Sequence, residues 1–355
     1  MREAASPRAE LADLRALSAR IGSDPLLIQG AGGNTSLKAD GILWIKASGT
    51  WLANALERDI MVPVEIAPLL GAVSSVDPAA ERAEQFVVAG LGASGLRPSI
   101  ETTVHALMTQ RVVVHVHCVN TIALAVRTDC GAELATRLDG LNWALVRYAR
   151  PGLPLALAIA EHSSKRPDVL VLANHGLVVA AETVEAAEAL LTDVTRRLAT
   201  EPRSAPPADM EKLRALAAAS KNVAFRLPES DAAHAVATDP ACTEIAARGS
   251  LYPDHVIFLG EGSVIALPVE DAQAVVARIG AAPVSIVFPG IGILMREDAT
   301  ASADAMARCL ADVATRIPPG APLRVLTAEE HLQLNDWDAE KYRQELARKA
   351  ARKSA

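Results

Sequence analysis

Two histidines stand two residues apart in VVVHVHCVN, a mainly β-branched segment at residues 112–120. Side chains of a β-strand alternate between its faces, so His115 and His117 are expected to project from the same side. A third histidine, His175, lies where the apolar segment VLVLANHG meets a glycine, and Glu101 lies upstream. Three imidazoles and a carboxylate that leave coordination positions open predict a catalytic site for Zn²⁺ or another divalent transition metal.

The histidines and Glu101 could also have purely structural roles. A single buried histidine usually has a backbone partner and no catalytic role, but the H-x-H spacing with a third histidine favours the metal. Glu101, in RPSIETTVHAL, also stands where a helix N-terminus would stabilise a carboxylate, with Ser99 as its cap. That position holds the carboxylate rigidly, so beside a metal it could ligate the ion or carry a proton. Most of the other histidines are expected to be ordinary: His105, His162, His234, His255 and His331.

The glycine-rich segment GAGGNTSLK, at residues 30–38, is a second candidate for binding chemistry. Glycines allow a tight turn whose N–H groups point at an anion, and Asn34, Thr35 and Ser36 add polar side chains. The spacing matches neither the P-loop nor the dinucleotide-binding motif, and a simple hairpin turn between two short strands explains it equally well. The turn ASGT, at residues 47–50, could supply a matching hydroxyl and N–H.

These residues need strands and helices to bring them together. Half of the 355 residues are hydrophobic and 3% are aromatic, which is typical of a compact α/β or α+β enzyme-like body. Apolar periodicity predicts strands at residues 112–117, 169–172 and 177–180, and helices at residues 7–21, 78–91, 100–109 and 181–200.

The polar, proline-rich segment EPRSAPPAD, at residues 201–209, predicts a linker. We therefore expect a metal-binding catalytic domain at residues 8–200 and a C-terminal α/β extension at residues 210–350. Within the extension, short strands are expected at residues 256–259, 264–266, 284–288 and 292–295.

Charge and cysteine usage restrict the partners. The net charge of −7 argues against a nucleic-acid-binding protein, which usually has a basic face. No uncharged apolar run reaches the ~18 residues that suggest a membrane span, and the N-terminus has no apolar signal-peptide core. The four cysteines form no C-x-x-C pair, which indicates reduced thiols and a cytoplasmic protein.

Five segments, in this order, resemble the class II aldolase/adducin family: GNTS, KASGT, PSIETTVHA, VHVHCVN and LANHG. The similarity covers roughly residues 10–200, and its metal motif is highly specific. The resemblance implies an α/β fold, a three-layer α/β/α sandwich with a central, mostly antiparallel sheet, followed here by a smaller C-terminal α/β region. It also implies a homo-oligomer, usually a tetramer, and a divalent metal, normally Zn²⁺, on three histidines.

The resemblance also assigns roles to residues that match the family's motifs. The metal ligands are His115, His117 and His175, and Glu101 is the catalytic acid/base, which ligates the metal when no substrate is bound. The positions that hold the substrate phosphate in sugar-phosphate aldolases match Gly33, Asn34, Ser48, Gly49 and Ser99.

The C-terminal segments RGSLYPDHV and VFPGIGIL resemble the aldolase half of long proteins that fuse a rhamnulose-1-phosphate aldolase to a short-chain dehydrogenase. No G-x-G-x-x-G signature follows them, so we expect a free-standing version of that half. Asp254 and His255 are expected to approach the active site from this region. A turn with a local Asp hydrogen bond explains these two residues equally well.

Two departures from the family's pattern matter. Short sugar-phosphate aldolases usually have a hydroxyl where this chain has Ile100, so the substrate is expected to be phosphorylated differently or not at all. The family's catalytic tyrosine comes from a neighbouring subunit, and Tyr148 does not match its motif.

The predicted activity is that of a metal-dependent aldehyde-lyase. It would cleave a ketose 1-phosphate or a related hydroxy-carbonyl sugar into a dihydroxyacetone-phosphate-like ketone and an aldehyde, through a metal-stabilised enediolate. An epimerase, dehydratase or decarboxylase on the same metal scaffold is the alternative, although Glu101 favours an aldolase because the family's epimerases have Asp there. A metal-dependent hydrolase and a non-catalytic adducin-like interaction module are further alternatives, and the intact histidines argue against the module.

Overall fold

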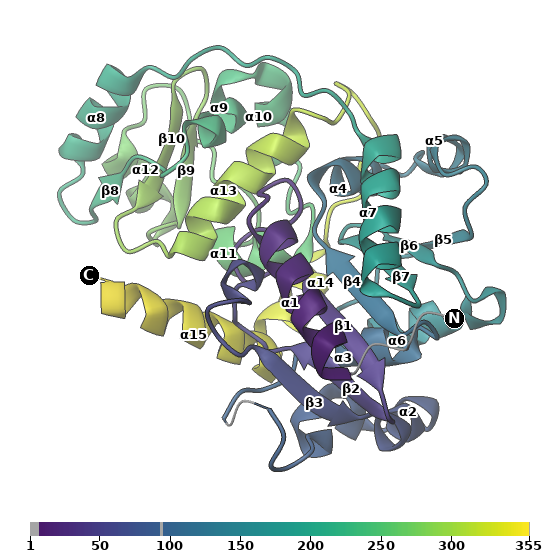
Figure 1. Cartoon of the computed structure of the whole chain (residues 1–355). Coiled ribbons are helices and arrows are strands. Elements are labelled where there is room, and N and C mark those ends of the chain that lie inside the picture. The colour runs from purple at the N-terminus through teal and green to yellow at the C-terminus, as the bar shows by residue number, and fades with distance from the viewer. Residues whose placement is uncertain (1–6, 93–94, 355) are drawn as a thin grey trace. The chain divides into compact units, whose positions relative to one another are not determined.

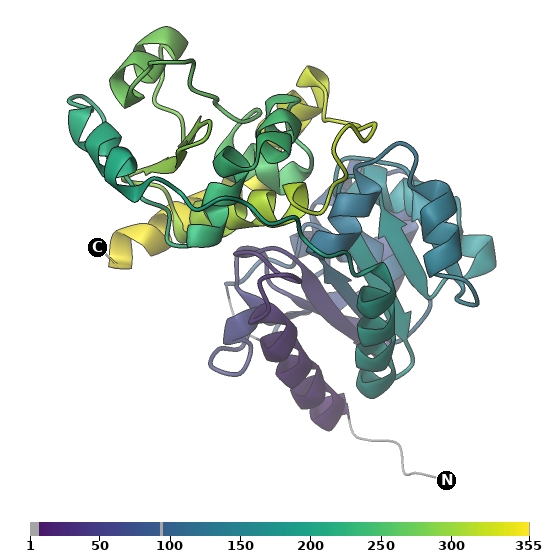
Figure 2. The same ribbon diagram turned by 90° about the horizontal axis from the view of Figure 1, so that it is seen from above.

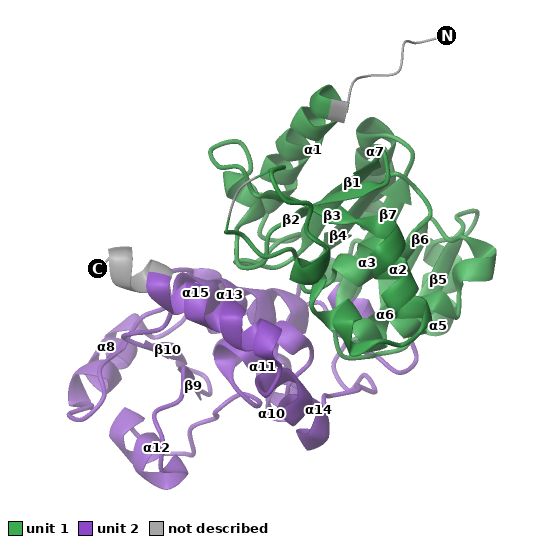
Figure 3. Cartoon of the chain, turned by 90° about the horizontal axis from the view of Figure 1, so that it is seen from below, with its two compact units in different colours: residues 1–121, 131–199 green, residues 122–130, 200–355 purple. Residues whose placement is uncertain are grey.

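The computed structural model describes residues 7–92 and 95–354, which form two compact units (Figure 3). Unit 1 comprises residues 1–121 and 131–199, and unit 2 comprises residues 122–130 and 200–355. The short segment 122–130 packs within unit 2, where Arg127 forms a β-bridge with Leu323. The sequence carries no signal for this exchange of a segment between units.

A seven-stranded sheet forms the centre of unit 1 (Figure 1). In spatial order its strands are β3 (Met61–Glu65), β2 (Ile42–Lys46), β1 (Asn34–Ala39), β4 (Val112–Val116), β7 (Gly176–Ala181), β6 (Val169–Leu172) and β5 (Trp143–Val146). All neighbouring pairs are antiparallel except β5 and β6. The central strand β4 is buried along its whole length, as expected for a β-branched strand covered on both faces.

Helices cover both faces of this sheet. On one face, α1 (Pro7–Gly22) and α7 (Val184–Leu198) lie side by side (Figures 1 and 2). The other face is covered by α2 (Ile66–Ser74), α3 (Thr102–Leu107) and α6 (Leu153–Ala160) (Figure 3). This is the predicted three-layer sandwich. Val113 of β4 packs in the cluster formed with α3 and α6, and strand alternation places His115 on the same face.

The remaining helical segments of unit 1 are short. They are α4 (Val119–Ala125), which continues into unit 2, α5 (Gly131–Arg137), and the 3₁₀ turns Leu52–Asn54, Pro78–Glu81, Ala83–Phe86 and Ser163–Lys165. The helix predicted at residues 78–91 is therefore wrong. Arg82, at φ −114° and ψ 62°, leaves the helical region and separates two single turns.

The glycine-rich segment does not form the hairpin turn. Asp40 and Gly41, with φ of 52° and 78°, connect β1 to β2, which is the backbone conformation that two-residue hairpins favour. The glycines of residues 30–33 precede β1 and lead the chain into Asn34.

Unit 2 is the smaller α/β region that the sequence predicts. Its three-stranded antiparallel sheet has the order β8 (Phe225–Arg226), β10 (Gly292–Arg296) and β9 (Ser285–Phe288). The helices are α8 (Met210–Ala219), α9 (Ala235–Thr238), α10 (Pro240–Ala247), α11 (Pro253–Leu259), α12 (Ala272–Ile279), α13 (Ala301–Ala314), α14 (Ala328–Asn335) and α15 (Asp338–Ser354), with a 3₁₀ turn at Asp231–His234. None of the helices described in either unit combines the length and apolar character needed to cross a bilayer.

Two strands predicted in this region are wrong. Residues 256–259 belong to helix α11, which begins at Pro253 and has Asp254 in its first turn; both residue types favour a helix start. A run of four apolar residues does not distinguish a strand from a buried helix. At residues 264–266, the structure has a single β-bridge between Ile265 and Val287.

Candidate metal centre

Four buried side chains of unit 1 converge beside β4. His115 lies in β4, directly opposite Asn34 of β1, and His117 follows the end of that strand. His175 lies in the turn between β6 and β7, and Glu101 immediately precedes α3. Their exposed fractions are between 1% and 6%. The topology thus brings together residues that are up to seventy-four positions apart.

The contacts within this group, which we call the Glu101–His cluster, are short. Oε2 of Glu101 lies 3.3 Å from Nε2 of His115, and Oε1 lies 3.3 Å from Nε2 of His175. The ring centroids of the three histidines are 5.0, 5.0 and 5.3 Å apart. One ligand atom from each residue lies within 4.8 Å of the others, so a single ion could contact all four.

Glycines allow the backbone to approach the histidines this closely. A Cβ on Gly176 would lie 2.5 Å from the Val116 carbonyl oxygen, and one on Gly32 would lie 2.8 Å from Nδ1 of His117. Any larger residue at either position would therefore displace the strand or the imidazole. The glycines of GAGG and NHG have this packing role in addition to any role in binding.

The cluster favours the charged form of its carboxylate. Burial alone would raise the pKa of Glu101, because an ion is poorly solvated in the protein interior. The surrounding imidazoles and a hydrogen bond from Asn34 outweigh burial and lower this pKa from 4.5 to about 2. Glu101 is therefore an anion at neutral pH, as a metal ligand or a general base must be.

The donor set fits a divalent transition metal. Three imidazole nitrogens with one carboxylate oxygen are ligands that Zn²⁺ and its neighbours bind readily. Nδ1 of His115 is 3.0 Å from the Leu177 carbonyl oxygen. Donating to that carbonyl fixes the ring so that Nε2 faces Glu101, the arrangement typical of metal-binding histidines.

Asn34 links the Glu101–His cluster to neighbouring polar residues. Its Nδ2 donates to Oε2 of Glu101 at 2.9 Å and to Oγ of Ser99 at 3.1 Å. Its Oδ1 is hydrogen bonded to Nε2 of His105, and Nδ1 of that ring lies 2.7 Å from Oγ of Ser36. Burial, followed by the nearby His115, lowers the pKa of His105 to about 3, so its ring is neutral.

His105 is a residue that the sequence reasoning missed, because it was expected to be ordinary. The available signal was its spacing from Glu101. Residues four apart on a helix share a face, so a histidine at this position in ETTVH is directed toward the same side as the carboxylate. The contacts that give it a role come from β1, which sequence spacing does not reveal.

The five positions matched to phosphate binding lie in neighbouring segments of unit 1. The Ser48 N–H donates to the Arg97 carbonyl at 2.9 Å, and the Ser99 N–H donates to the Lys46 carbonyl at 3.0 Å. Gly33 and Gly49 both have positive φ, at 59° and 73°. The structure therefore brings the glycine-rich segment, the ASGT turn and the start of α3 together.

Two polar groups in these segments are unusual. The hydroxyl of Ser48 is buried and has no hydrogen-bond partner among the residues that the structure describes. Lys46, 2% exposed, donates from Nζ to the carbonyls of Ala31 at 2.7 Å and Gly33 at 3.0 Å. A buried ammonium thus holds the glycine-rich segment in place, and sequence reasoning did not assign it this role.

Asp254 and His255 lie in α11 of unit 2, where both have partners within that unit. Arg343 of α15 forms an ion pair with Asp254. The His255 ring accepts a hydrogen bond at Nδ1 from the Leu251 N–H at 3.3 Å. Their participation in the active site stays a prediction.

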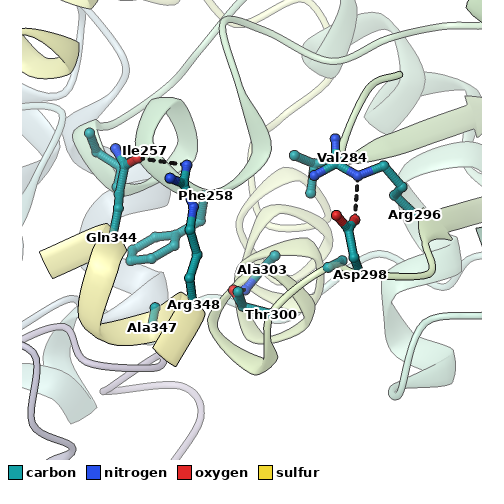
Figure 4. A pocket seen from close by; sticks show the side chains of 11 residues that line it. Ile257, Phe258, Val284, Arg296, Asp298, Thr300, Ala303, Gln344, Ala347 and Arg348 are labelled. Atoms are coloured by element: carbon teal, nitrogen blue, oxygen red, sulfur yellow. Dashed lines mark hydrogen bonds and ion pairs between the residues drawn. The ribbon is translucent and has the colours of Figure 1, made fainter. Parts of the chain in front are cut away.

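Unit 2 also contains a cavity of about 350 Å³ (Figure 4). Arg296 pairs with Asp298 on one side of it, and Arg348 lies near Phe258 on the other. Its lining includes none of the residues predicted for the active site.

A comparison with protein families identifies unit 1. The model of the class II aldolase and adducin N-terminal domain matches residues 13–200, more than half of the chain. The chain belongs to the class II aldolase and adducin family. The matched segment contains the whole Glu101–His cluster, and a divalent metal is the cofactor of the class II aldolases.

Known proteins give partial matches to this class II aldolase family member. The uncharacterized oxidoreductase YuxG of Bacillus subtilis (strain 168) is 30% identical over 178 residues, which are 46% of this chain and 25% of that protein. The chain thus matches about a quarter of that relative's length. A partial match to a longer protein named as an oxidoreductase agrees with the resemblance to the aldolase half of a fusion protein.

Solved structures resemble a little over half of the chain. The N-terminal class II aldolase domain of a conserved protein from Thermoplasma acidophilum is 25% identical, with a TM-score of 0.47, covering 56% of this chain and 96% of that one. L-fuculose-1-phosphate aldolase from Thermus thermophilus is 21% identical, with a TM-score of 0.35, covering 53% and 92%.

Proposed function

We propose that this chain is a metal-dependent aldehyde-lyase. Its substrate would be a ketose 1-phosphate or a related hydroxy-carbonyl sugar, cleaved to a dihydroxyacetone-phosphate-like ketone and an aldehyde. The observation that carries the proposal is the Glu101–His cluster, in which one buried carboxylate contacts imidazoles from separate segments. Membership of the class II aldolase family supports it.

The cluster residues would hold the cofactor. His115, His117 and His175 would bind Zn²⁺ or another divalent transition metal, with Glu101 as a further ligand before substrate arrives. When bound, such an ion is a Lewis acid that polarises carbonyl and hydroxyl oxygens.

Glu101 would carry the proton of the reaction. In the cleavage, the hydroxyl that becomes the aldehyde carbonyl loses a proton, the carbon–carbon bond breaks, and the carbon that becomes part of the ketone keeps the electron pair and gains a proton. As an anion, Glu101 would take up the proton that the hydroxyl releases and deliver it to that carbon. Glu101 is a rigidly held carboxylate, with Oε2 accepting from Asn34 and Oε1 near His175. A general acid/base at such a position typically contributes on the order of 10²- to 10⁴-fold to the rate.

The lysines of the neighbouring strands support a metal-dependent mechanism rather than a Schiff base. Lys46 donates to the carbonyls of Ala31 and Gly33, and Lys38 donates to those of Met108 and Gln110. Burial lowers the pKa of Lys38 to about 8, but each of the two side-chain nitrogens is held by two backbone carbonyls, whereas a Schiff-base lysine must be an accessible nucleophile.

The substrate phosphate, where there is one, would bind at the glycine-rich segment and the ASGT turn. Gly33, Asn34, Ser48, Gly49 and Ser99 are the proposed binding residues, and the buried Ser48 hydroxyl is available to accept or donate there. Ile100 replaces the family's usual hydroxyl, so unphosphorylated substrates belong in the same assay. The family resemblance also supports a homotetramer, which light scattering on the purified protein would test.

His117→Ala tests the proposal directly. The metal content of purified protein, measured by mass spectrometry, is expected to fall well below the wild-type level. Cleavage of L-fuculose 1-phosphate, L-rhamnulose 1-phosphate and related ketoses is expected to fall by about 10³-fold or more. His162→Ala, a histidine of unit 1 outside the cluster, is the matched control and is expected to retain both.

Undiminished cleavage and metal content in His117→Ala would reject the proposal. Product analysis separates the other reactions on this scaffold. An epimerised sugar, a dehydrated product or released CO₂ would indicate an epimerase, a dehydratase or a decarboxylase that uses the same metal site.

A further inference from the structure

A continuous series of hydrogen bonds leads from Ser36 to Glu101. Ser36 and Asn34 are two residues apart on β1, so both side chains lie on the face covered by α3. His105 of α3 lies between them, with Nδ1 at 2.7 Å from Oγ of Ser36 and Nε2 hydrogen bonded to Oδ1 of Asn34. All the residues in this series are at most 5% exposed.

The amide of Asn34 determines the direction of every bond in the series. The group of Asn34 that contacts Oε2 of Glu101 and Oγ of Ser99 is the Nδ2 amide, which can only donate. The other end of that amide, Oδ1, can only accept, so Nε2 of His105 carries the proton. In the neutral ring Nδ1 is then the acceptor, and the Ser36 hydroxyl donates to it.

We propose that His105 is a positioning residue of the active site, which fixes the side-chain amide of Asn34 so that this amide donates to Glu101. The inference rests on the proposed function, because it assigns Glu101 the role of the base. Without the Nε2–H of His105, the Asn34 amide could rotate and present its oxygen to the carboxylate, which would repel it.

The same geometry assigns Asn34 a role toward the base. One hydrogen of its Nδ2 is donated to Glu101 at 2.9 Å and the other to Ser99 at 3.1 Å. A substrate phosphate would therefore have to displace Ser99 as the acceptor of one of these N–H groups, while the bond to Glu101 remains. Loss of His105 is expected to slow the chemical step and to leave the affinity for the sugar phosphate largely unchanged.

The tautomer of His105 gives a test that needs neither metal nor activity. Two-bond ¹H–¹⁵N correlation spectra of ¹⁵N-histidine-labelled protein distinguish a ring protonated on Nε2 from one protonated on Nδ1, and the His105 signal is assigned by its loss in His105→Gln. We expect protonation on Nε2 only, and Ser36→Ala is expected to let the other tautomer appear. Protonation on Nδ1 in the wild-type protein would overturn the inference.

Kinetics test the consequence. His105→Leu removes the donor to Asn34, and kcat is expected to fall about 10²-fold with KM within about three-fold, as for a small misplacement of a catalytic group. His105→Gln, whose amide can still donate to Asn34, is expected to recover at least about ten-fold of that loss. His162→Leu is the matched control, and metal content is measured for each variant.

The outcomes separate the two proposals. Equal losses of kcat in His105→Leu and His105→Gln would overturn the positioning role. A rise in KM with kcat unchanged would also overturn it. If His105→Leu fails to fold, His105→Gln is judged by kcat, and Ser36→Ala is judged by the tautomer of His105 and by kcat. A wild-type protein with no lyase activity but with His105 protonated on Nε2 would overturn the proposed function and leave the hydrogen-bond arrangement standing.

Discussion

Each unit buries carboxylates, but the two units stabilise them with different partners. In unit 1, Glu101 is surrounded by three imidazoles and the amide of Asn34. In unit 2, Asp254 and Glu340 share the guanidinium of Arg343, and the three residues are 4%, 1% and 8% exposed. We call this second group the Arg343 cluster.

The partners decide what each cluster can do. A guanidinium is always protonated and offers only donors, so Arg343 pairs with its carboxyl groups at every pH and cannot ligate a cation. The guanidinium carbon of Arg343 also lies 5.1 Å from the ring centroid of Phe258. This contact holds α15 against α11. Neutral imidazoles keep a lone pair that can ligate a cation. Burial of a carboxylate alone therefore does not indicate a catalytic site; the kind of partner distinguishes the two.

Breaking the Arg343 cluster should give the largest effect on folding. Arg343→Met leaves two buried carboxylates without their cation, and the free energy of unfolding is expected to fall by about 3–5 kcal/mol. Urea denaturation of the purified protein measures this. Lys341→Met, on the same helix, is the control. It removes an ion pair with Asp336 in which the two side chains are 53% and 81% exposed, and the free energy of unfolding is expected to change by less than about 1 kcal/mol.

Arg343→Met is expected to leave the metal content of unit 1 intact, because Arg343 is not among the residues of the Glu101–His cluster. Glu101→Gln should do the reverse, lowering metal content with little change in the unfolding of the metal-free protein. If Arg343→Met and Glu101→Gln changed stability and metal content to the same extent, the two clusters would not differ in role.

A histidine of unit 2 sharpens the contrast with the imidazoles of the Glu101–His cluster. His255 is fully buried, and burial, followed by the nearby His331, lowers its pKa from 6.5 to about 4. Between these values the unfolded chain binds a proton that the folded chain does not. The neutral His255 ring therefore costs no stability above pH 6.5. As the pH falls from 6.5 to 4, the free energy of unfolding is expected to decline by about 3 kcal/mol because of this group.

His255→Asn isolates this contribution, since its Oδ1 can still accept from the Leu251 N–H. The urea midpoint of the variant should match the wild type near pH 8 and fall less steeply between pH 6.5 and 4. Parallel pH profiles for the two proteins would contradict the assignment.

The sequence predicts which side chains come together in unit 1 better than it predicts the contacts that support them. Three histidines and a carboxylate stand out because H-x-H in a β-branched strand is a local pattern, and the mostly antiparallel sandwich is implied by the family resemblance. His105 and Lys46 were missed because their roles depend on hydrogen bonds to β1 and to the glycine-rich segment, which no local pattern encodes.

Unit 2 shows the complementary limit. Residues 256–259 were predicted as a strand and form helix α11, because tertiary packing decides the conformation of a short apolar run. The buried ion pair between Asp254 and Arg343 joins residues 89 positions apart. Neither feature produces a periodic signal, whereas the metal motif does.

Glycine substitutions separate close packing at the Glu101–His cluster from ordinary backbone effects. Gly176→Ala places a methyl group 2.5 Å from the Val116 carbonyl oxygen and 3.3 Å from Cε1 of His115. The backbone must shift, so a loss of about 1–3 kcal/mol in unfolding free energy is expected, with lower metal affinity. A Cβ added at Gly71 in helix α2 meets nothing within 4 Å. The unfolding free energy of Gly71→Ala is therefore expected to rise by up to about 1 kcal/mol, with metal affinity unchanged. If calorimetry and metal titration found the two variants alike, the glycine at residue 176 would not be what allows the histidine-bearing strands to approach, and the geometry of the Glu101–His cluster would have to arise from the strand register alone.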